Sequence, residues 1–165
     1  MKTIVICAFP GSGKTYAYTH YNGLPYKMLD SDSSEYSWVK DENGKNTKVR
    51  NPDFPQNYIN HIKENLGKVD VIFVSSHKEV RTALREAGID YVIASPLHSD
   101  TIKEAWLKRL RDRGSSEEFV NVIDEHFYEW IDDMIKEGTV EKGVSFYGMS
   151  ENSYITNGVL KLLID

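Results

Sequence analysis

The segment AFPGSGKT, residues 8–15, decides the fold that this sequence predicts. It follows a compact apolar run at residues 2–8 (KTIVICA), which indicates a strand buried on both faces, and it precedes a segment that we expect to be helical. Its spacing matches the phosphate-binding pattern GxxxxGK[ST], except that Ala8 stands at the first glycine. A glycine-rich turn between such a strand and a helix predicts a nucleotide-binding α/β domain.

The residue types of this loop suggest what it binds. We expect main-chain N–H groups of Gly11, Ser12, Gly13, Lys14 and Thr15 to surround the β-phosphate of ATP at the positive end of the helix dipole. Lys14 would neutralise the β- and γ-phosphate oxygens, and the Thr15 hydroxyl would bind Mg²⁺. The alternative is a glycine-rich turn that only packs a helix against a strand. ATP and Mg²⁺ are the ligands that the pattern favours.

The rest of the chain alternates between strand and helix patterns. Apolar runs at 69–75 and 89–94 predict buried strands, and residues 77–88 between them have the spacing of a helix that ends at Gly88. Such a unit favours a parallel sheet with helices on its faces. Further elements are expected at 27–30 (a short strand), 54–67, 99–114 and 115–138 (helices), 144–149 (a strand) and 156–164 (a short helix).

Length and composition point to one folded domain over residues 1–165. About a quarter of the residues are Leu, Ile, Val or Phe, above the roughly 20% below which chains stay unfolded. The formal charge of −5 gives no global positive field for polynucleotides or anionic membranes. A single cysteine, Cys7, and the lack of a signal peptide or membrane span favour the cytoplasm. We expect a monomer or a small homo-oligomer.

The sequence resembles the small P-loop kinases of the adenylate-kinase-like and shikimate-kinase-like group, whose loops often read GxPGSGKT. It is also similar to uncharacterised phage-borne nucleotide kinases, which share the order of elements from LDSDSS through VSSHKEVR to RLRDRG. The resemblance implies a P-loop NTPase three-layer sandwich with a helical lid. It also implies an ATP-dependent phosphotransferase.

Two aspartates follow the short strand in KMLDSDSS, residues 27–34. Asp30 and Asp32 point to the same side in strand geometry. The resemblance implies that Asp30 serves Mg²⁺ through water, and that Asp32, with Ser33 beside it, binds the acceptor and orients or deprotonates its hydroxyl. The alternative is that these residues only cap and turn the chain.

Arginines near the expected cleft are the other candidates. Arg109 and Arg113 are four residues apart on one helical face, and the resemblance places them on a mobile lid, residues 99–116, that clamps ATP. A solvated helix face is the alternative. Arg81, just after the strand at 69–75, is our candidate for binding a phosphate group of the acceptor. That strand ends in Ser75-Ser76, where many P-loop proteins carry an aspartate for Mg²⁺.

The polar stretch 31–53 is either an acceptor-side loop or a small hairpin around Asn43-Gly44. Its aromatic residues Tyr36 and Trp38 are candidates for covering a base. His77, at the start of a helix beside the expected cleft, is a candidate for contact with substrate.

Three functions remain open at this point. A nucleoside monophosphate kinase is favoured, with a small-molecule nucleotide as its substrate. A kinase for a hydroxyl acceptor is the alternative, because a phosphate is already an anion at pH 7 and needs no base, whereas an alcohol does. That acceptor would be a small alcohol, a modified nucleoside or a polynucleotide 5′-OH, although the acidic pI of 5.6 disfavours a polynucleotide. The third is a non-catalytic nucleotide-binding switch.

Overall fold

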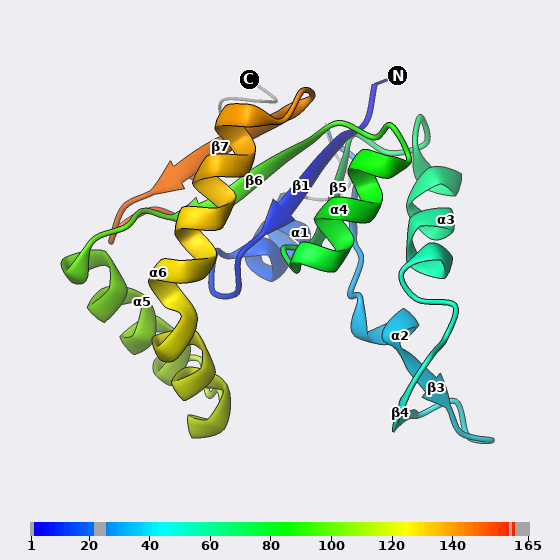
Figure 1. Cartoon of the computed structure of the whole chain (residues 1–165), viewed down its shortest axis with the longest axis horizontal. Helices are drawn as coiled ribbons and strands as arrows, with labels where there is room; N and C mark the ends of the chain where they lie inside the picture. Colours follow the sequence, from blue (N-terminus) through cyan, green and yellow to red (C-terminus); the bar gives the residue numbers. More distant parts are fainter. Residues whose placement is uncertain (1, 22–25, 159, 161–165) are drawn as a thin grey trace.

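The computed structural model describes residues 2–21, 26–158 and 160. Its elements in chain order are β1 (Ile4–Ala8), α1 (Lys14–Tyr21), β2 (Met28–Asp30), α2 (Ser34–Ser37), β3 (Trp38–Lys40), β4 (Asn46–Arg50), α3 (Gln56–Asn65), β5 (Val71–Ser75), α4 (Lys78–Glu86), β6 (Tyr91–Pro96), α5 (Asp100–Asp112), α6 (Glu117–Val140) and β7 (Val144–Met149). Figure 1 shows their arrangement.

A parallel sheet in the order β2-β5-β1-β6-β7 forms the centre of the molecule. In this register Ala8, at the end of β1, pairs with Ser75, at the end of β5. Asp30, at the end of β2, pairs with Phe73 on β5. The loops that follow these three strands therefore leave the sheet at the same edge, where ligands bind in open α/β sheets.

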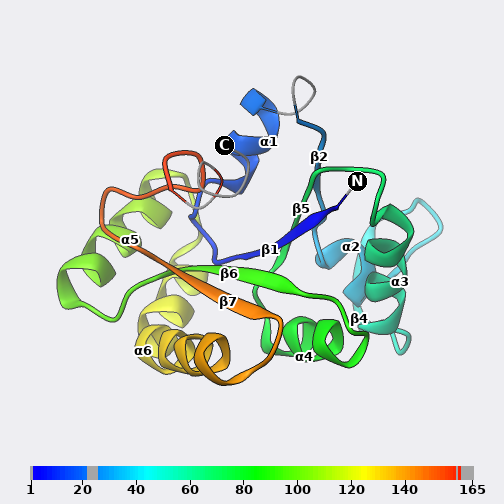
Figure 2. The ribbon, with the colours of Figure 1, turned by 90° about the horizontal axis from the view of Figure 1, so that it is seen from above.

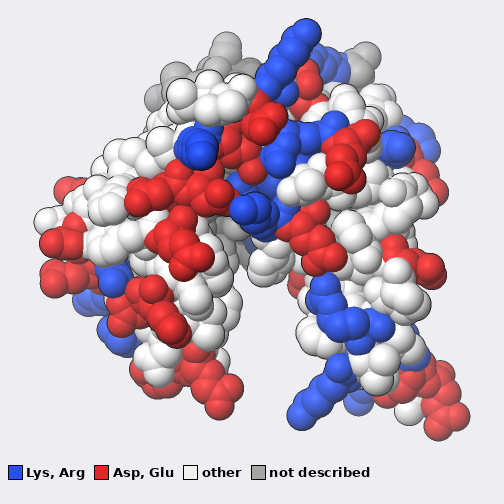
Figure 3. All heavy atoms as spheres, in the orientation of Figure 1, with Lys and Arg blue, Asp and Glu red and all other residues white. Residues whose placement is uncertain are grey.

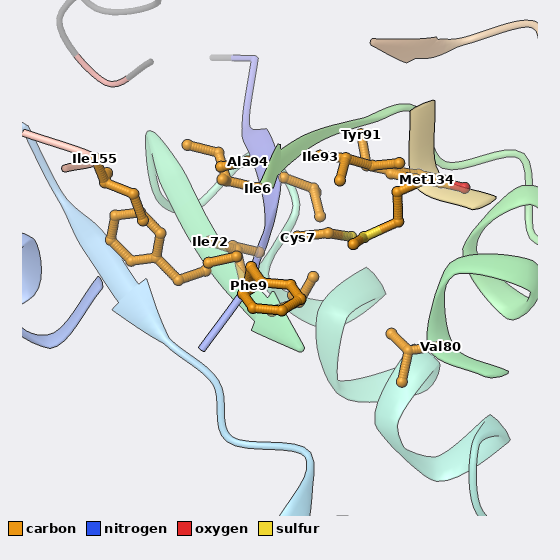
Figure 4. Packing of buried hydrophobic residues seen from close by; sticks show 14 of the residues in the cluster. Ile6, Cys7, Phe9, Ile72, Val80, Tyr91, Ile93, Ala94, Met134 and Ile155 are labelled. Atoms are coloured by element: carbon orange, nitrogen blue, oxygen red, sulfur yellow. The ribbon is translucent and has the colours of Figure 1, made fainter. Parts of the chain in front are cut away.

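Helices cover both faces of the sheet. Figure 2 shows α1 on one face and α4 and α6 on the other, which gives the predicted three-layer α/β sandwich. Cys7 of β1, Val80 of α4 and Met134 of α6 belong to the buried cluster between these layers (Figure 4). Burial raises the pKa of the Cys7 thiol, so Cys7 is an inert core residue.

The strands and helices predicted up to residue 149 and outside 31–53 are confirmed to within a few residues, and the strand at 144–149 is β7. Residues 31–53 contain the short helix α2 and a hairpin of β3 and β4, with Gly44 in its turn at φ +76°. Most of the helix predicted at 156–164 lies outside the described residues. None of the helices in the described part of the chain has the length and apolar character needed to cross a membrane.

Candidate active site

The phosphate loop turns tightly between β1 and α1. Gly11 and Gly13 have φ values of +84° and +92°, in the left-handed region that favours glycine. A Cβ on Gly11 would lie 3.1 Å from Trp106 Nε1, and one on Gly13 would lie 3.2 Å from the ring of Tyr154. These glycines therefore serve both the backbone turn and the close approach of two aromatic side chains.

Helix α5 is fixed directly to this loop. Trp106, which is fully buried, donates from Nε1 to the carbonyl oxygen of Pro10 at 2.8 Å. Arg109 donates to the carbonyl oxygens of Gly11 at 3.0 Å and Glu151 at 3.1 Å. Four side chains of the helix are buried: Ile102, Trp106, Leu107 and Leu110. The mobile lid at 99–116 stays a prediction, and in this structure its helix forms a packed wall of the site.

The guanidinium of Arg109 lies between two aromatic rings. Its central carbon is 4.0 Å from the ring centroid of Trp106 and 3.9 Å from that of Tyr154. Burial lowers the pKa of Arg109, and the nearby Tyr154 opposes this effect. Stacking and hydrogen bonding together hold this cation at the entrance to the phosphate loop.

The segment after β7 completes the loop from the other side. The main-chain N–H of Ile155 donates to the carbonyl oxygen of Ser12 at 2.9 Å, and Tyr154 packs beside Gly13. The sequence analysis missed this role, because the segment is polar and carries no motif.

A cleft of about 580 Å³ lies between the phosphate loop, α5 and the segment after β7. Its volume is in the range typical of small-molecule sites. It brings together Lys14 and Thr15 with Arg109 and Arg113, four residues that the sequence analysis assigned to ATP. Arg113 donates to the hydroxyl of Ser115 at 3.0 Å, and burial lowers the pKa of its guanidinium.

Asp30 lies opposite the phosphate loop. Its Oδ1 is 3.8 Å from Lys14 Nζ, which is an ion-pair distance too long for a hydrogen bond. This oxygen and the hydroxyl of Ser12 are the buried side-chain polar atoms without a hydrogen-bond partner among the described residues. Buried polar atoms left unpaired at one site indicate that a polar ligand belongs there.

The residues present fit a magnesium ion that arrives with a nucleotide. Mg²⁺ typically takes one or two oxygen ligands from the protein and the rest from phosphates and water. Thr15 and Asp30 supply oxygens of that kind. Across residues 2–21, 26–158 and 160, no group of three or more His, Cys, Asp or Glu is placed to hold a metal ion by itself.

Asp32 and Ser33 directly precede α2. The Oδ1 of Asp32 accepts a hydrogen bond from the Ser34 N–H at 2.9 Å, so Asp32 has the turn role that the sequence analysis kept as an alternative. The carboxylate is nevertheless exposed, and it lines a groove together with Ser33. The two roles are compatible, because each carboxylate has two oxygens.

Tyr58 fixes the chain between the two aspartates. Its buried hydroxyl donates to the carbonyl oxygen of Ser31 at 2.6 Å, and the Ser31 hydroxyl is 2.9 Å from His61 Nε2. Sequence analysis did not find this support. Tyr36 stacks on His61, with ring centroids 5.0 Å apart, and lies tilted against Tyr58, with ring centroids 5.3 Å apart, so Tyr36 belongs to this supporting cluster.

The groove that Asp32 lines is larger than the nucleotide cleft, at about 1080 Å³, and lies on the other side of the phosphate loop, beside Phe9 and Pro10. One wall is formed by α6, and the other by α2 and the hairpin. Figure 1 shows both walls extending below the sheet, and Figure 3 shows the hollow between them. Trp38 and His77 line this groove, and their contact with a substrate stays a prediction.

Arg81 is not placed as the sequence analysis expected. Its side chain is only 3% exposed, and Nη1 forms a 2.9 Å ion pair with Glu137 of α6. Nε donates to the carbonyl oxygen of Ser76 at 2.9 Å, and Nη2 lies 3.4 Å from Asp133. The structure therefore does not support Arg81 as a residue that binds a phosphate group of the acceptor, because the charge of its guanidinium is already neutralised by carboxylates.

Comparison with solved structures supports the fold assignment. The crystal structure of a gluconokinase from Sinorhizobium meliloti 1021 matches this chain with a TM-score of 0.51 at 18% sequence identity. The match covers 98% of this chain and 89% of that one. No protein-family model and no curated protein sequence matches the chain.

The chain thus shares its three-layer α/β fold with this gluconokinase, in agreement with the fold that the resemblance implied. The match gives no support to the narrower resemblance to phage-borne nucleotide kinases.

Proposed function

We propose that this protein is an ATP-dependent kinase that transfers the γ-phosphoryl group to a hydroxyl group of a small molecule. The position of Asp32 carries this proposal. Its carboxylate lines the groove beside the phosphate loop, on the side away from the nucleotide cleft. A carboxylate there suits an alcohol acceptor, which has a proton to lose.

Each residue of the site would have its own role in the reaction. Lys14, Arg109 and Arg113 would stabilise the negative charge that spreads over the γ-phosphoryl oxygens. Thr15 and Asp30 would hold Mg²⁺, which neutralises charge on the β- and γ-phosphates when bound. Asp32 would orient the acceptor hydroxyl and take its proton as the new O–P bond forms and the bond to the ADP oxygen breaks.

The solved neighbour is called a gluconokinase, and gluconate is a molecule with several hydroxyl groups, which agrees with this choice. A nucleoside monophosphate kinase is the second candidate. One observation favours it: the Arg50 guanidinium lies 5.4 Å from the Trp38 ring centroid. This wall of the groove thus presents a cation for a phosphate beside an aromatic ring for a base.

An acceptor panel with radiolabelled ATP tests the proposal. It would contain alcohols, sugar acids, nucleosides, all nucleoside monophosphates and 5′-hydroxyl oligonucleotides. We expect label on a hydroxyl acceptor, with Lys14→Ala as the inactive control. Binding of ATP without transfer to any acceptor would instead support the nucleotide-binding switch.

A further inference from the structure

The cations that line the groove already face carboxylates. Arg50 Nη2 lies 3.2 Å from Glu79 Oε2, and Lys78 Nζ lies 3.6 Å from Asp133 Oδ1. Arg81 is paired with Glu137 and Asp133, as described above. An anionic ligand would therefore have to compete with protein carboxylates for each of these cations.

The two other basic side chains of the groove add little positive charge. Lys136 is exposed and has no ion pair among those found in the described residues, but Asp132 and Asp133 precede it by four and three residues on α6. Carboxylates at that spacing lie on the same helical face. Partial burial lowers the pKa of His77 below its usual 6.5, and the charge of Arg50 adds to this effect, so His77 carries less positive charge near neutral pH than a free imidazole.

The nucleotide cleft and the groove differ in charge. The groove has four cationic side chains against five carboxylates: Arg50, Lys78, Arg81 and Lys136 against Asp32, Glu79, Glu129, Asp132 and Asp133. The cleft has four cationic side chains and two carboxylates. The cations are Lys14, Lys108, Arg109 and Arg113, and the carboxylates are Asp112 and Glu151. Because an anion needs uncompensated donors, the cleft suits the phosphates of ATP and the groove does not suit a second anion.

The groove offers aromatic surface instead of free cations. Trp38 and Phe54 line it from the hairpin side, and Phe119 and Trp130 line it from α6. The Arg50 guanidinium lies 5.1 Å from the Phe54 ring centroid, which helps to fix that wall. Aromatic rings facing a cavity favour a flat ligand, which stacks on them and has little charge to desolvate.

We infer that the acceptor of this kinase is an uncharged nucleoside, which pairs a flat base with a hydroxyl-bearing sugar, and is neither a nucleoside monophosphate nor a sugar acid. This inference rests on the proposed function. The base would lie between the aromatic walls, and a sugar hydroxyl would meet Asp32 beside the phosphate loop.

The first experiment compares matched acceptors at saturating ATP and Mg²⁺. Each nucleoside is paired with its 5′-monophosphate, gluconate represents the sugar acids, and an amino sugar represents cationic acceptors. We expect at least one nucleoside to exceed its monophosphate, gluconate and the amino sugar in kcat/KM by about tenfold or more. Gluconate or the amino sugar with the highest kcat/KM overturns the inference but leaves the proposed transfer to a hydroxyl group standing, whereas a nucleoside monophosphate with the highest kcat/KM favours the second candidate function and overturns both. Transfer to no acceptor, with ATP binding intact by calorimetry, overturns both.

The second experiment changes the groove itself. Glu79→Gln removes the carboxylate that neutralises Arg50, so the affinity of the groove for a nucleoside monophosphate should rise severalfold while that for the nucleoside stays the same. Glu86→Gln is the matched control, because Glu86 ends the same helix, is exposed and does not line the groove. Equal monophosphate affinities in the two variants would contradict the inferred role of charge pairing.

Discussion

Arg109 donates a hydrogen bond of 3.0 Å to the carbonyl oxygen of Gly11, so the backbone of the phosphate loop orients a cation of α5. A guanidinium that is already oriented loses less side-chain entropy when phosphate arrives. The arrangement thus combines a structural role with the expected role in phosphate binding.

Replacing Arg109 by Leu should impair both roles. We expect the free energy of unfolding to fall by about 2 kcal/mol, because hydrogen bonds from a charged group to two backbone carbonyls are lost, and ATP to bind more weakly. Chemical denaturation and calorimetry would measure these effects. Arg111→Leu is the control, since Arg111 lies on the same helix and its recorded ion pair is an exposed one with Glu117. Equal losses of stability and of ATP affinity in the two variants would show that Arg109 has no particular role in the loop or in binding.

Lys14→Ala should abolish catalysis while the fold survives. The side chain is 30% exposed and its ion pair with Asp30 is long, so its contribution to stability is small. Its charge is nonetheless needed by the phosphates in the transition state, and kcat should fall by about 10² or more. Phosphoryl transfer and thermal unfolding would be measured on the same preparation. A folded variant with the parent rate would refute the assignment.

Asp32→Asn separates proton transfer from metal binding. With a hydroxyl acceptor, kcat should fall by about 10² with little change in acceptor KM, because the base is lost and the shape of the groove is kept. Asp30→Asn is the comparison, and there the loss should be accompanied by a higher Mg²⁺ requirement. A normal kcat for Asp32→Asn would show that Asp32 serves only the turn before α2 and does not act as a base.

The predicted parts of this molecule are those with strong local patterns. Apolar runs such as 2–8 and 69–75 identify buried strands, and the glycine-lysine loop predicts where a nucleotide would bind. Arg81 was misjudged because Lys78, Arg81 and Arg85 have the spacing of an exposed basic face, and its partner Glu137 is 56 residues away. One signal was available, since Glu137 continues the buried positions Phe127, Ile131 and Met134 at helical spacing. Nothing in the sequence indicated the contact between Ile155 and Ser12, because both partners are backbone groups.

The buried ion pair of Arg81 leads to a prediction about stability. Glu137 also accepts hydrogen bonds from Tyr91 and Arg85, both at 2.7 Å. Arg81→Met should lower the free energy of unfolding by about 3 kcal/mol or more, because a buried carboxylate loses a partner. Denaturant titration would measure the loss. Lys78→Met is the control, since its side chain is 71% exposed and it should change stability by less than about 0.5 kcal/mol.

His77 should make the fold sensitive to mild acid. Its pKa is lower in the folded protein than the usual 6.5, so the unfolded chain binds a proton first as the pH falls. The free energy of unfolding should therefore decrease as the pH drops below 6.5. In His77→Gln this decrease should be shallower, which thermal unfolding at several pH values would show. Identical pH profiles would indicate that His77 titrates normally.

The backbone contact between Ile155 and Ser12 has a consequence for biosynthesis. Residues 8–15 form the phosphate loop, yet one of its walls comes from the segment after β7, which is synthesised later than every strand of the sheet. A nascent chain can assemble β1, β5 and β6 before that segment emerges, but its nucleotide cleft lacks Tyr154 and Glu151 until then. Tight nucleotide binding should therefore begin only once the segment after β7 has been synthesised, so ATP cannot stabilise a nascent chain that still lacks it.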